Sequence, residues 1–270
     1  MCRKSLIFDN FTRGRCWHFL LCGLCDSAGK LSCGKLNTVF AKRSHKPERI
    51  DTGDYTQAEY ETFLKEIRFI NRRLGDSAAM RASLLKDIEE KRLDEFSVLD
   101  VGAGSGELLQ EIAEFAQTSG WKASLVGLDL HERSAASVRD ESKDHPEISS
   151  VQGNALSLPF ADKTFDYSIC SLFTHHLSDE QIPNVLKEMS RVAKQGIVVI
   201  DLERSAVAWI LYNLFCFVYR ISPLVREDGL LSIRKGFRAN EFVEIGNAAG
   251  LENVSVERHS PYRVVMKSIV

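Results

Sequence analysis

Short apolar runs alternate with amphipathic segments along the chain from residue 96 onward. The runs have the length and composition of buried strands, and the segments between them repeat apolar positions with a helical period. We therefore expect helices over 107–119, 132–143 and 179–193, and strands over 96–101, 123–130, 148–152, 165–172 and 196–202. Strands separated by helices indicate an α/β fold, in which right-handed crossovers join a doubly wound, mostly parallel sheet.

The C-terminal end breaks this alternation. A helix expected over 240–249 stops at Gly250, and two more apolar runs follow over 251–258 and 262–268. The link between the two runs, His259-Ser-Pro261, is too short to hold a crossover helix. The runs should therefore pair antiparallel, which predicts a Rossmann-like, seven-stranded sheet that closes with an antiparallel hairpin.

Two helices are predicted ahead of the first strand, in a helical cap over 45–95. Thr56-Gln-Ala-Glu59 has the pattern of a capping box. The helix that it opens should end near Gly75, and its apolar face carries Phe63, Ile67 and Ile70. A second helix is expected over 77–93. These helices would cover one end of the sheet in the main domain, residues 96–270.

An unusually apolar stretch, Ser205–Tyr219, lies in an insertion over about 204–238. Apolar residues occur on all sides of it, so one face cannot bury them all against a sheet. The stretch is shorter than the roughly 20 residues that cross a bilayer. We expect a lid helix that forms part of a hydrophobic cavity. A fully buried helix, a homodimer contact and docking to a membrane surface are the alternatives.

Residues 1–44 differ in composition from the rest of the chain. They carry a net charge of +6, against −8 for the remainder, and five of the seven cysteines. Cys22-Gly-Leu-Cys25 has the spacing of half a zinc site, but no second pair exists, so no metal is expected. A poorly ordered, basic extension is predicted. An organellar targeting peptide also fits the scarcity of acidic residues, whereas a secretory signal does not.

Charge and the remaining cysteines limit the partners and the compartment. Cys170 and Cys216 lie in apolar runs and are expected to be reduced core residues, which is typical of cytoplasmic proteins. The net charge of −2 and the acidic main domain argue against binding to the phosphate backbone of a nucleic acid. No transmembrane segment is predicted, and we expect a monomer or a homodimer.

The most informative motif is the run Val98–Glu107, in which a predicted strand breaks into a glycine turn before a helix. Glycines at 102, 104 and 106 let the backbone pass close to a ligand where a Cβ would collide. The N-terminal amides of the following helix should point at the same place. The motif predicts a site for a nucleotide-like molecule.

Three other segments should meet this turn at the carboxyl ends of the strands. Gly127-Leu-Asp129-Leu130 ends the second strand, and its carboxylate can accept hydrogen bonds from both hydroxyls of a ribose. Gly153-Asn154-Ala155-Leu156 ends the third, where an amide can face a base and a leucine can face its ring. Cys170-Ser171-Leu-Phe-Thr-His175-His176 ends the fourth.

These four ordered segments and the closing hairpin resemble the class I S-adenosylmethionine-dependent methyltransferases. The resemblance covers about residues 96–270. It is greatest to small-molecule enzymes of the ubiquinone/menaquinone-biosynthesis type, and the flanking stretches resemble a bacterial subgroup associated with polyketide synthases. It implies S-adenosyl-L-methionine as cofactor, with a hydrophobic phenolic, quinone or polyketide-type acceptor.

The resemblance also assigns roles to residues of this chain. Asp100 would face the methionine ammonium, and Asp129 would bind the ribose hydroxyls. Asn154, where the family often has Asp, would face the adenine edge, and two leucines would enclose its ring. The implied cofactor-binding set is Asp100, Gly102, Ala103, Gly104, Gly106, Asp129, Leu130, Asn154, Ala155, Leu156 and Ser171. Helix capping by Asp129 and a turn at Asn154 are the structural alternatives.

A base is needed only if the acceptor must lose a proton. His175 and His176 are the candidates because they follow the fourth strand and their unperturbed pKa lies near neutrality. Asp201, at the end of the fifth strand, could also face the acceptor. The alternatives for these residues are loop packing and helix capping.

Other functions compete with this interpretation. A dinucleotide-dependent dehydrogenase would have G-x-G-x-x-G, but the third glycine comes one residue early. A methyltransferase-like binding protein without activity, and an enzyme that methylates a protein, stay open.

Overall fold

The computed structural model describes residues 38–74 and 76–269. The chain forms two compact units, Met1–Lys42 and Arg43–Val270, and the second contains every element discussed below. The predicted cysteine-rich, poorly ordered segment lies almost entirely outside the described residues. Cys170 and Cys216 are free and buried, as predicted.

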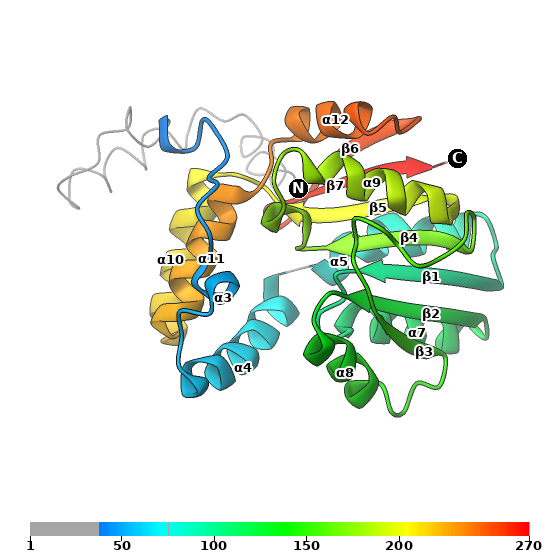
Figure 1. Cartoon of the computed structure of the whole chain (residues 1–270), viewed down its shortest axis with the longest axis horizontal. Coiled ribbons are helices and arrows are strands. Elements are labelled where there is room, and N and C mark those ends of the chain that lie inside the picture. The colour runs from blue at the N-terminus through cyan, green and yellow to red at the C-terminus, as the bar shows by residue number, and fades with distance from the viewer. Residues whose placement is uncertain (1–37, 75, 270) are drawn as a thin grey trace, which may run out of the picture. The chain divides into compact units, whose positions relative to one another are not determined.

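The second unit is built on a seven-stranded sheet with the strand order β3-β2-β1-β4-β5-β7-β6 (Figure 1). The strands β1 to β5 are parallel, and β7 runs antiparallel to both β5 and β6. Their bounds are β1 Glu95–Val101, β2 Lys122–Asp129, β3 Ile148–Gln152, β4 Phe165–Ser171, β5 Ala193–Leu202, β6 Val254–His259 and β7 Arg263–Ile269. The doubly wound sheet and the closing hairpin are confirmed.

Helices cover both faces of this sheet because each buried strand points successive side chains to opposite sides. Leu99 and Val199 belong to a core shared with the apolar faces of α9 (Gln181–Val192) and α12 (Ala239–Ala248). Their neighbours Val98 and Val198 belong to a second core, which includes residues of α7 (Glu107–Ser119) and α8 (Glu132–Glu141). The parallel pairing of β1 with β2 and β4, and of β4 with β5, brings the carboxyl ends of these strands to one edge of the sheet.

The second N-terminal helix differs from the prediction in place and in shape. It comprises α5 (Asp76–Met80), a π-helical turn η1 (Arg81–Leu85) and α6 (Lys86–Glu90). Leu84 and Ile88 are fully buried in the second core, so this helix packs on a face of the sheet rather than on its end. These buried side chains hold the helix against the sheet, so it does not form the predicted cap over the sheet's end.

A group of helices lies beyond the carboxyl edge of the sheet (Figure 1). We call α3 (Arg49–Thr52), α4 (Gln57–Leu74), α10 (Ala206–Tyr219) and α11 (Pro223–Lys235) the helical cover. The predicted capping box opens α4, with Thr56 N–H donating to Glu59 Oε2 at 2.8 Å and Glu59 N–H donating back to Thr56 Oγ1 at 3.3 Å.

Carboxylates from distant parts of the chain hold the helical cover together. Asp228 of α11 accepts hydrogen bonds from the N–H groups of Arg49 and Ile50, each at 2.9 Å, and so caps α3. Glu66 of α4 accepts from the N–H of Ser222 at 3.0 Å and from its hydroxyl at 2.6 Å, just ahead of α11. Among the described residues, no helix combines the length and apolar character needed to cross a membrane.

Candidate active site

The glycine turn after β1 has a left-handed backbone conformation that suits glycine. Gly102, Gly104 and Gly106 have φ of +76°, +57° and +79°, values that side-chain-bearing residues rarely adopt. The N–H groups of Gly102 and Ala103 donate to Leu128 O at 2.8 and 3.1 Å, which ties the turn to β2. A Cβ at Gly102 would lie 2.6 Å from the Phe173 ring, whereas one at Gly104 would meet open space. The turn therefore packs on one side and leaves Gly104 accessible on the other.

Asp100 is a buried carboxylate that the protein leaves unsatisfied. Its side chain lies at the end of β1 and lines the cavity described below. Only 3% of the residue is exposed, and Oδ1 has no hydrogen-bond partner among the described residues. Burial, and secondarily the nearby charge of Asp129, raises the pKa of Asp100 to about 7. The oxygen without a partner can accept a hydrogen bond from a donor in the cavity.

Asp129 is fixed at the end of β2 by two backbone groups. Its Oδ2 accepts from Gly104 N–H at 3.2 Å, and its Oδ1 accepts from His131 N–H at 2.9 Å. The side chain does not cap α8, since that helix begins at Glu132 and has His131 at the N-cap position. The carboxylate therefore joins the glycine turn to the end of β2.

The loop after β3 forms a tight turn beside this region. Asn154 is exposed, and its Oδ1 accepts from Leu156 N–H at 2.9 Å. Ala155 is buried, whereas Leu156 and Leu130 are exposed apolar side chains, at 36% and 60%. The turn alternative for Asn154 is thus present in the structure.

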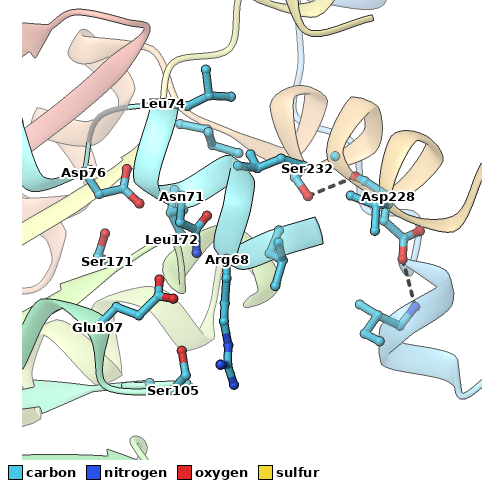
Figure 2. A pocket seen from close by; sticks show the side chains of 18 of the residues that line it. Arg68, Asn71, Leu74, Asp76, Ser105, Glu107, Ser171, Leu172, Asp228 and Ser232 are labelled. Carbon is cyan, nitrogen blue, oxygen red and sulfur yellow. Dashed lines mark hydrogen bonds between the residues drawn. The ribbon is translucent and has the colours of Figure 1, made fainter. Parts of the chain in front are cut away.

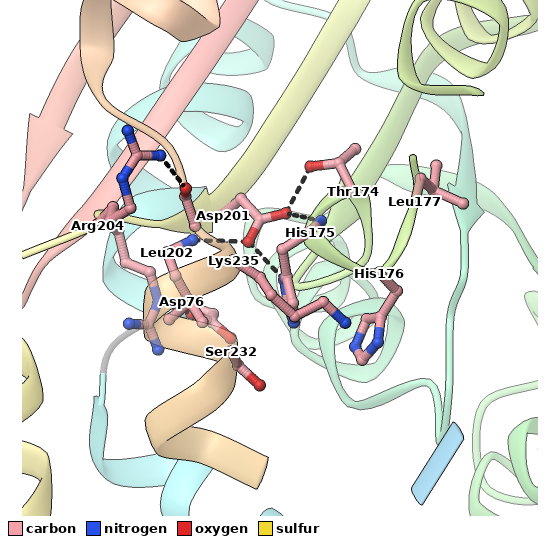
Figure 3. Close-up of polar contacts among 12 residues, drawn as sticks. Asp76, Thr174, His175, His176, Leu177, Asp201, Leu202, Arg204, Ser232 and Lys235 are labelled. Atoms are coloured by element: carbon pink, nitrogen blue, oxygen red, sulfur yellow. Dashed lines mark hydrogen bonds and ion pairs between the residues drawn. The ribbon is translucent and has the colours of Figure 1, made fainter. Parts of the chain in front are cut away.

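His175 and Asp201 form a buried pair at the ends of the loop after β4 and of β5 (Figure 3). His175 Nδ1 lies 2.7 Å from Asp201 Oδ1, and the same carboxylate accepts from the Thr174 hydroxyl and from the N–H groups of His175 and Leu202. These partners outweigh burial and lower the pKa of Asp201 to about 2. Burial lowers the pKa of His175 despite the attraction of Asp201.

This geometry assigns the proton on the imidazole. Because Asp201 is ionised and can only accept, Nδ1 of His175 must carry the hydrogen that bridges them. The other ring nitrogen, Nε2, then has a free lone pair on a residue that lines the cavity. His175 can accept a proton from a bound molecule, and Asp201 orients it.

His176 is in a different environment from its neighbour. Its Nδ1 lies 3.3 Å from Asp51 Oδ2 and 3.9 Å from Glu48 Oε2. Burial opposes protonation, but these two carboxylates raise the pKa of His176 above its usual value. Glu48, His175 and His176 bring their ligand atoms within 4.8 Å of one another, yet the Lys235 ammonium, 3.0 Å from Glu48 Oε1, already supplies a cation there.

A cavity of about 1790 Å³ lies between Asp100, His175 and His176 and the helical cover. Some of the predicted site residues among the described ones do not line it: Gly106, Asp129, Leu130, Asn154, Ala155, Leu156 and Asp201. At one end it is lined by Asp100, Gly102, Ala103, Gly104 and Ser171. The buried Ser171 hydroxyl has no partner within the part of the chain that the structure describes. At the other end it is lined by aromatic and aliphatic side chains: Tyr60, Phe63, Leu64 and Ile67 of α4, and Leu211, Tyr212 and Phe215 of α10. His175 and His176 line it as well.

The sequence did not lead us to expect that α4 lines the cavity. Phe63 and Ile67 lie on the predicted apolar face, but they line the cavity instead of covering the sheet. Arg68 and Asn71 of the same helix extend toward Ser105 and Glu107 of the opposite wall (Figure 2). Arg68 also pairs with Glu141 of α8 at 2.7 Å. The aromatic residues clustered between 55 and 63 are the sequence feature that could have indicated this role in the cavity.

Comparison with known proteins identifies the fold and the family. A family model described as "Methyltransferase domain" matches residues 98–196. The demethylmenaquinone methyltransferase of Shouchella clausii is 36% identical over 182 residues, which cover 61% of this chain and 74% of that relative.

Solved structures agree at the level of the fold. Magnesium protoporphyrin IX methyltransferase from Synechocystis superposes with a TM-score of 0.55 at 12% identity, covering 80% of this chain and 96% of that one. A methyltransferase from Aquifex aeolicus gives 0.52 at 21% identity, covering 74% and 96%. The chain belongs to the class I S-adenosylmethionine-dependent methyltransferases, and S-adenosylmethionine is its methyl donor.

Proposed function

We propose that the enzyme methylates a hydrophobic small molecule of the phenolic, quinone or polyketide type. The observation that carries this proposal is the cavity, which is lined by Asp100 and the glycine turn, by His175, and by a group of aromatic and aliphatic side chains from α4 and α10. A relative named for demethylmenaquinone supports a quinone-type acceptor.

The residues at the donor end fit S-adenosylmethionine. Asp100, with its unpartnered Oδ1, would pair with the methionine ammonium, and the open space at Gly104 would admit the ligand. Ala103, Gly102, Gly106 and Ser171 would complete this part of the pocket. When bound, S-adenosylmethionine supplies a methyl group activated by a positively charged sulfur.

The nucleoside would lie along the ends of β2 and β3. Asp129, already held by backbone N–H groups, would accept hydrogen bonds from the ribose hydroxyls. Asn154 would donate through its amide nitrogen to the adenine edge, beside the backbone of Ala155. The exposed side chains of Leu130 and Leu156 would enclose the ring, which gives these apolar residues a partner.

His175 would act as the general base for an acceptor that carries an acidic proton. Its Nε2 takes the proton from a phenolic hydroxyl or an activated carbon, and Asp201 stabilises the imidazolium that forms. The acceptor atom forms a bond to the methyl carbon as the sulfur–methyl bond breaks, and that electron pair stays on sulfur. The helical cover would exclude water from the site and align the two reactants. His176, paired with Asp51 and Glu48, would contact the acceptor rather than remove its proton.

Methyl transfer to a defined panel tests this function. The enzyme is incubated with methyl-labelled S-adenosylmethionine and with phenols, hydroquinones, polyketide products and aliphatic alcohols, and labelled products are identified by mass spectrometry. We expect label in an apolar aromatic acceptor and none in the aliphatic alcohols. Label recovered only in added protein, or tight cofactor binding with no transfer to any acceptor, would overturn the proposal.

A further inference from the structure

The helix α10 has two apolar faces, and among the described residues only one of them packs inside the molecule. Ala208, Tyr212 and Phe215 line the cavity. On the outer side, Leu214, Phe217 and Val218 are 55%, 78% and 62% exposed. No charged residue occurs between Ala206 and Tyr219. The all-round apolar pattern is therefore explained on the inner side by the cavity, while the outer side stays in contact with water at a free-energy cost.

The outer face of α10 is continuous with the opening of the cavity. Leu211 is 45% exposed and also lines the cavity, and Leu64 of α4 is 38% exposed and lines it from the facing helix. Two apolar side chains thus stand at the rim, where the inside and the outside of the molecule meet. A hydrophobic molecule could pass this rim without leaving apolar surroundings.

Cationic residues flank the C-terminal end of this face. Arg220 and Arg226 line a surface depression together with Phe217 and Val218. Arg73 of α4 stacks over the rings of Phe69 and Tyr219, at 3.9 and 5.8 Å from their centroids. The nearest acidic neighbour in sequence, Glu227, is directed to Arg49 at 3.6 Å. An apolar surface bordered by arginines is complementary to an anionic lipid surface.

We propose that the outer face of α10 docks onto an anionic lipid bilayer and delivers the rim of the cavity to the membrane surface. The helix has 14 residues and is too short to cross a bilayer, so it would lie in the interface, with Leu214 and Phe217 below the headgroups and the arginines among them. The proposal rests on the proposed function, because a hydrophobic acceptor is what the bilayer would supply.

Vesicle sedimentation of the full chain tests this docking without using turnover. The probes are vesicles of phosphatidylcholine alone and vesicles that also contain phosphatidylglycerol. We expect binding to the anionic vesicles, at least about tenfold weaker for Phe217→Glu or Leu214→Glu. Gln117→Glu, which adds the same negative charge at an exposed position of α7, should bind the vesicles as well as the unsubstituted protein does. Arg220→Gln should weaken vesicle binding and make that binding less sensitive to salt. Arg139→Gln on α8 should change neither quantity.

Two outcomes would overturn the docking proposal. One is the absence of binding to either kind of vesicle. The other is a concentration-dependent dimer, seen by sedimentation velocity and abolished by Phe217→Glu, with no vesicle binding, which would assign the face to a second copy of the chain. Failure of the proposed function is seen separately, as absent transfer to acceptors dispersed in detergent while vesicle binding persists.

Discussion

The two walls of the cavity are built by different means. The donor wall consists of strand ends and a glycine turn, and backbone hydrogen bonds such as that from Gly102 to Leu128 fix its side chains. The helical cover is held by side-chain contacts across long stretches of chain, from Glu66 to Ser222 and from Asp228 to Arg49. A wall fixed by a sheet can orient a reactive donor closely, whereas a wall of helices can vary and admit different acceptors.

Two buried aspartates at the strand ends sharpen this difference. Asp201 has four hydrogen-bond partners within the protein, and its pKa is lowered to about 2. Asp100 has an unpartnered oxygen, and burial raises its pKa to about 7. The first carboxylate holds His175, and we propose that the second pairs with the methyl donor. Chemistry and donor binding should therefore respond separately to substitution.

The largest effect is expected from removing the imidazole at the junction of the two walls. His175→Ala should lower kcat by about 10²- to 10⁴-fold, the range for a general base, while the Kd of S-adenosylmethionine changes little. The fold should survive because Asp201 keeps the Thr174 hydroxyl and two backbone N–H groups. Single-turnover kinetics and calorimetric titration measure the two quantities.

His176→Ala is the matched control for this prediction. It removes the adjacent imidazole, which pairs with Asp51 and not with Asp201, and should reduce kcat far less. Equal losses in the two variants, or near-normal turnover of His175→Ala, would exclude His175 as the base.

A smaller effect, confined to the donor wall, is expected at Asp100. Asp100→Asn should raise the Kd of S-adenosylmethionine by roughly ten- to hundredfold, the value of a charge-assisted hydrogen bond. In the parent enzyme the Kd should rise as pH falls below about 7, because the carboxyl then becomes neutral. The variant should lose this pH dependence. A parallel pH profile in both proteins would contradict the assignment.

The same shift has a consequence for stability. The folded pKa of Asp100 lies above its unfolded value, so the folded chain binds more protons between about pH 4 and pH 7. The contribution of Asp100 to the free energy of unfolding is therefore present below that window and lost as pH rises through it. The stability of Asp100→Asn minus that of the unsubstituted protein should therefore be larger at pH 8 than at pH 5. Thermal unfolding of both proteins at the two pH values measures this difference.

The sequence predicted the strands and the glycine turn of the donor wall and the helix α10 of the helical cover, but it did not place α4 beside the cavity. Strand periodicity, the short link at 259–261 and the glycine spacing are local signals, and each is confirmed in the fold. The position of α4 depends on contacts such as Arg68 with Glu141, which join residues far apart in the chain. The different environments of His175 and His176 likewise depend on distant carboxylates. Asp201 lies beside the first, and Asp51 and Glu48 lie beside the second, and no local sequence pattern links them.

The smallest effect should come from loosening the helical cover without touching the cavity. Glu66→Gln weakens the acceptor that caps the start of α11, so it should lower the free energy of unfolding by about 1 kcal/mol. The KM for the methyl acceptor should rise a few-fold, since α4 and α11 would fit each other less well, whereas the Kd of S-adenosylmethionine should stay constant. Glu61→Gln, an exposed change on the same helix, should leave all three quantities unaltered. If Glu66→Gln instead weakened donor binding and left the acceptor KM unchanged, the two walls would not divide the two substrates between them.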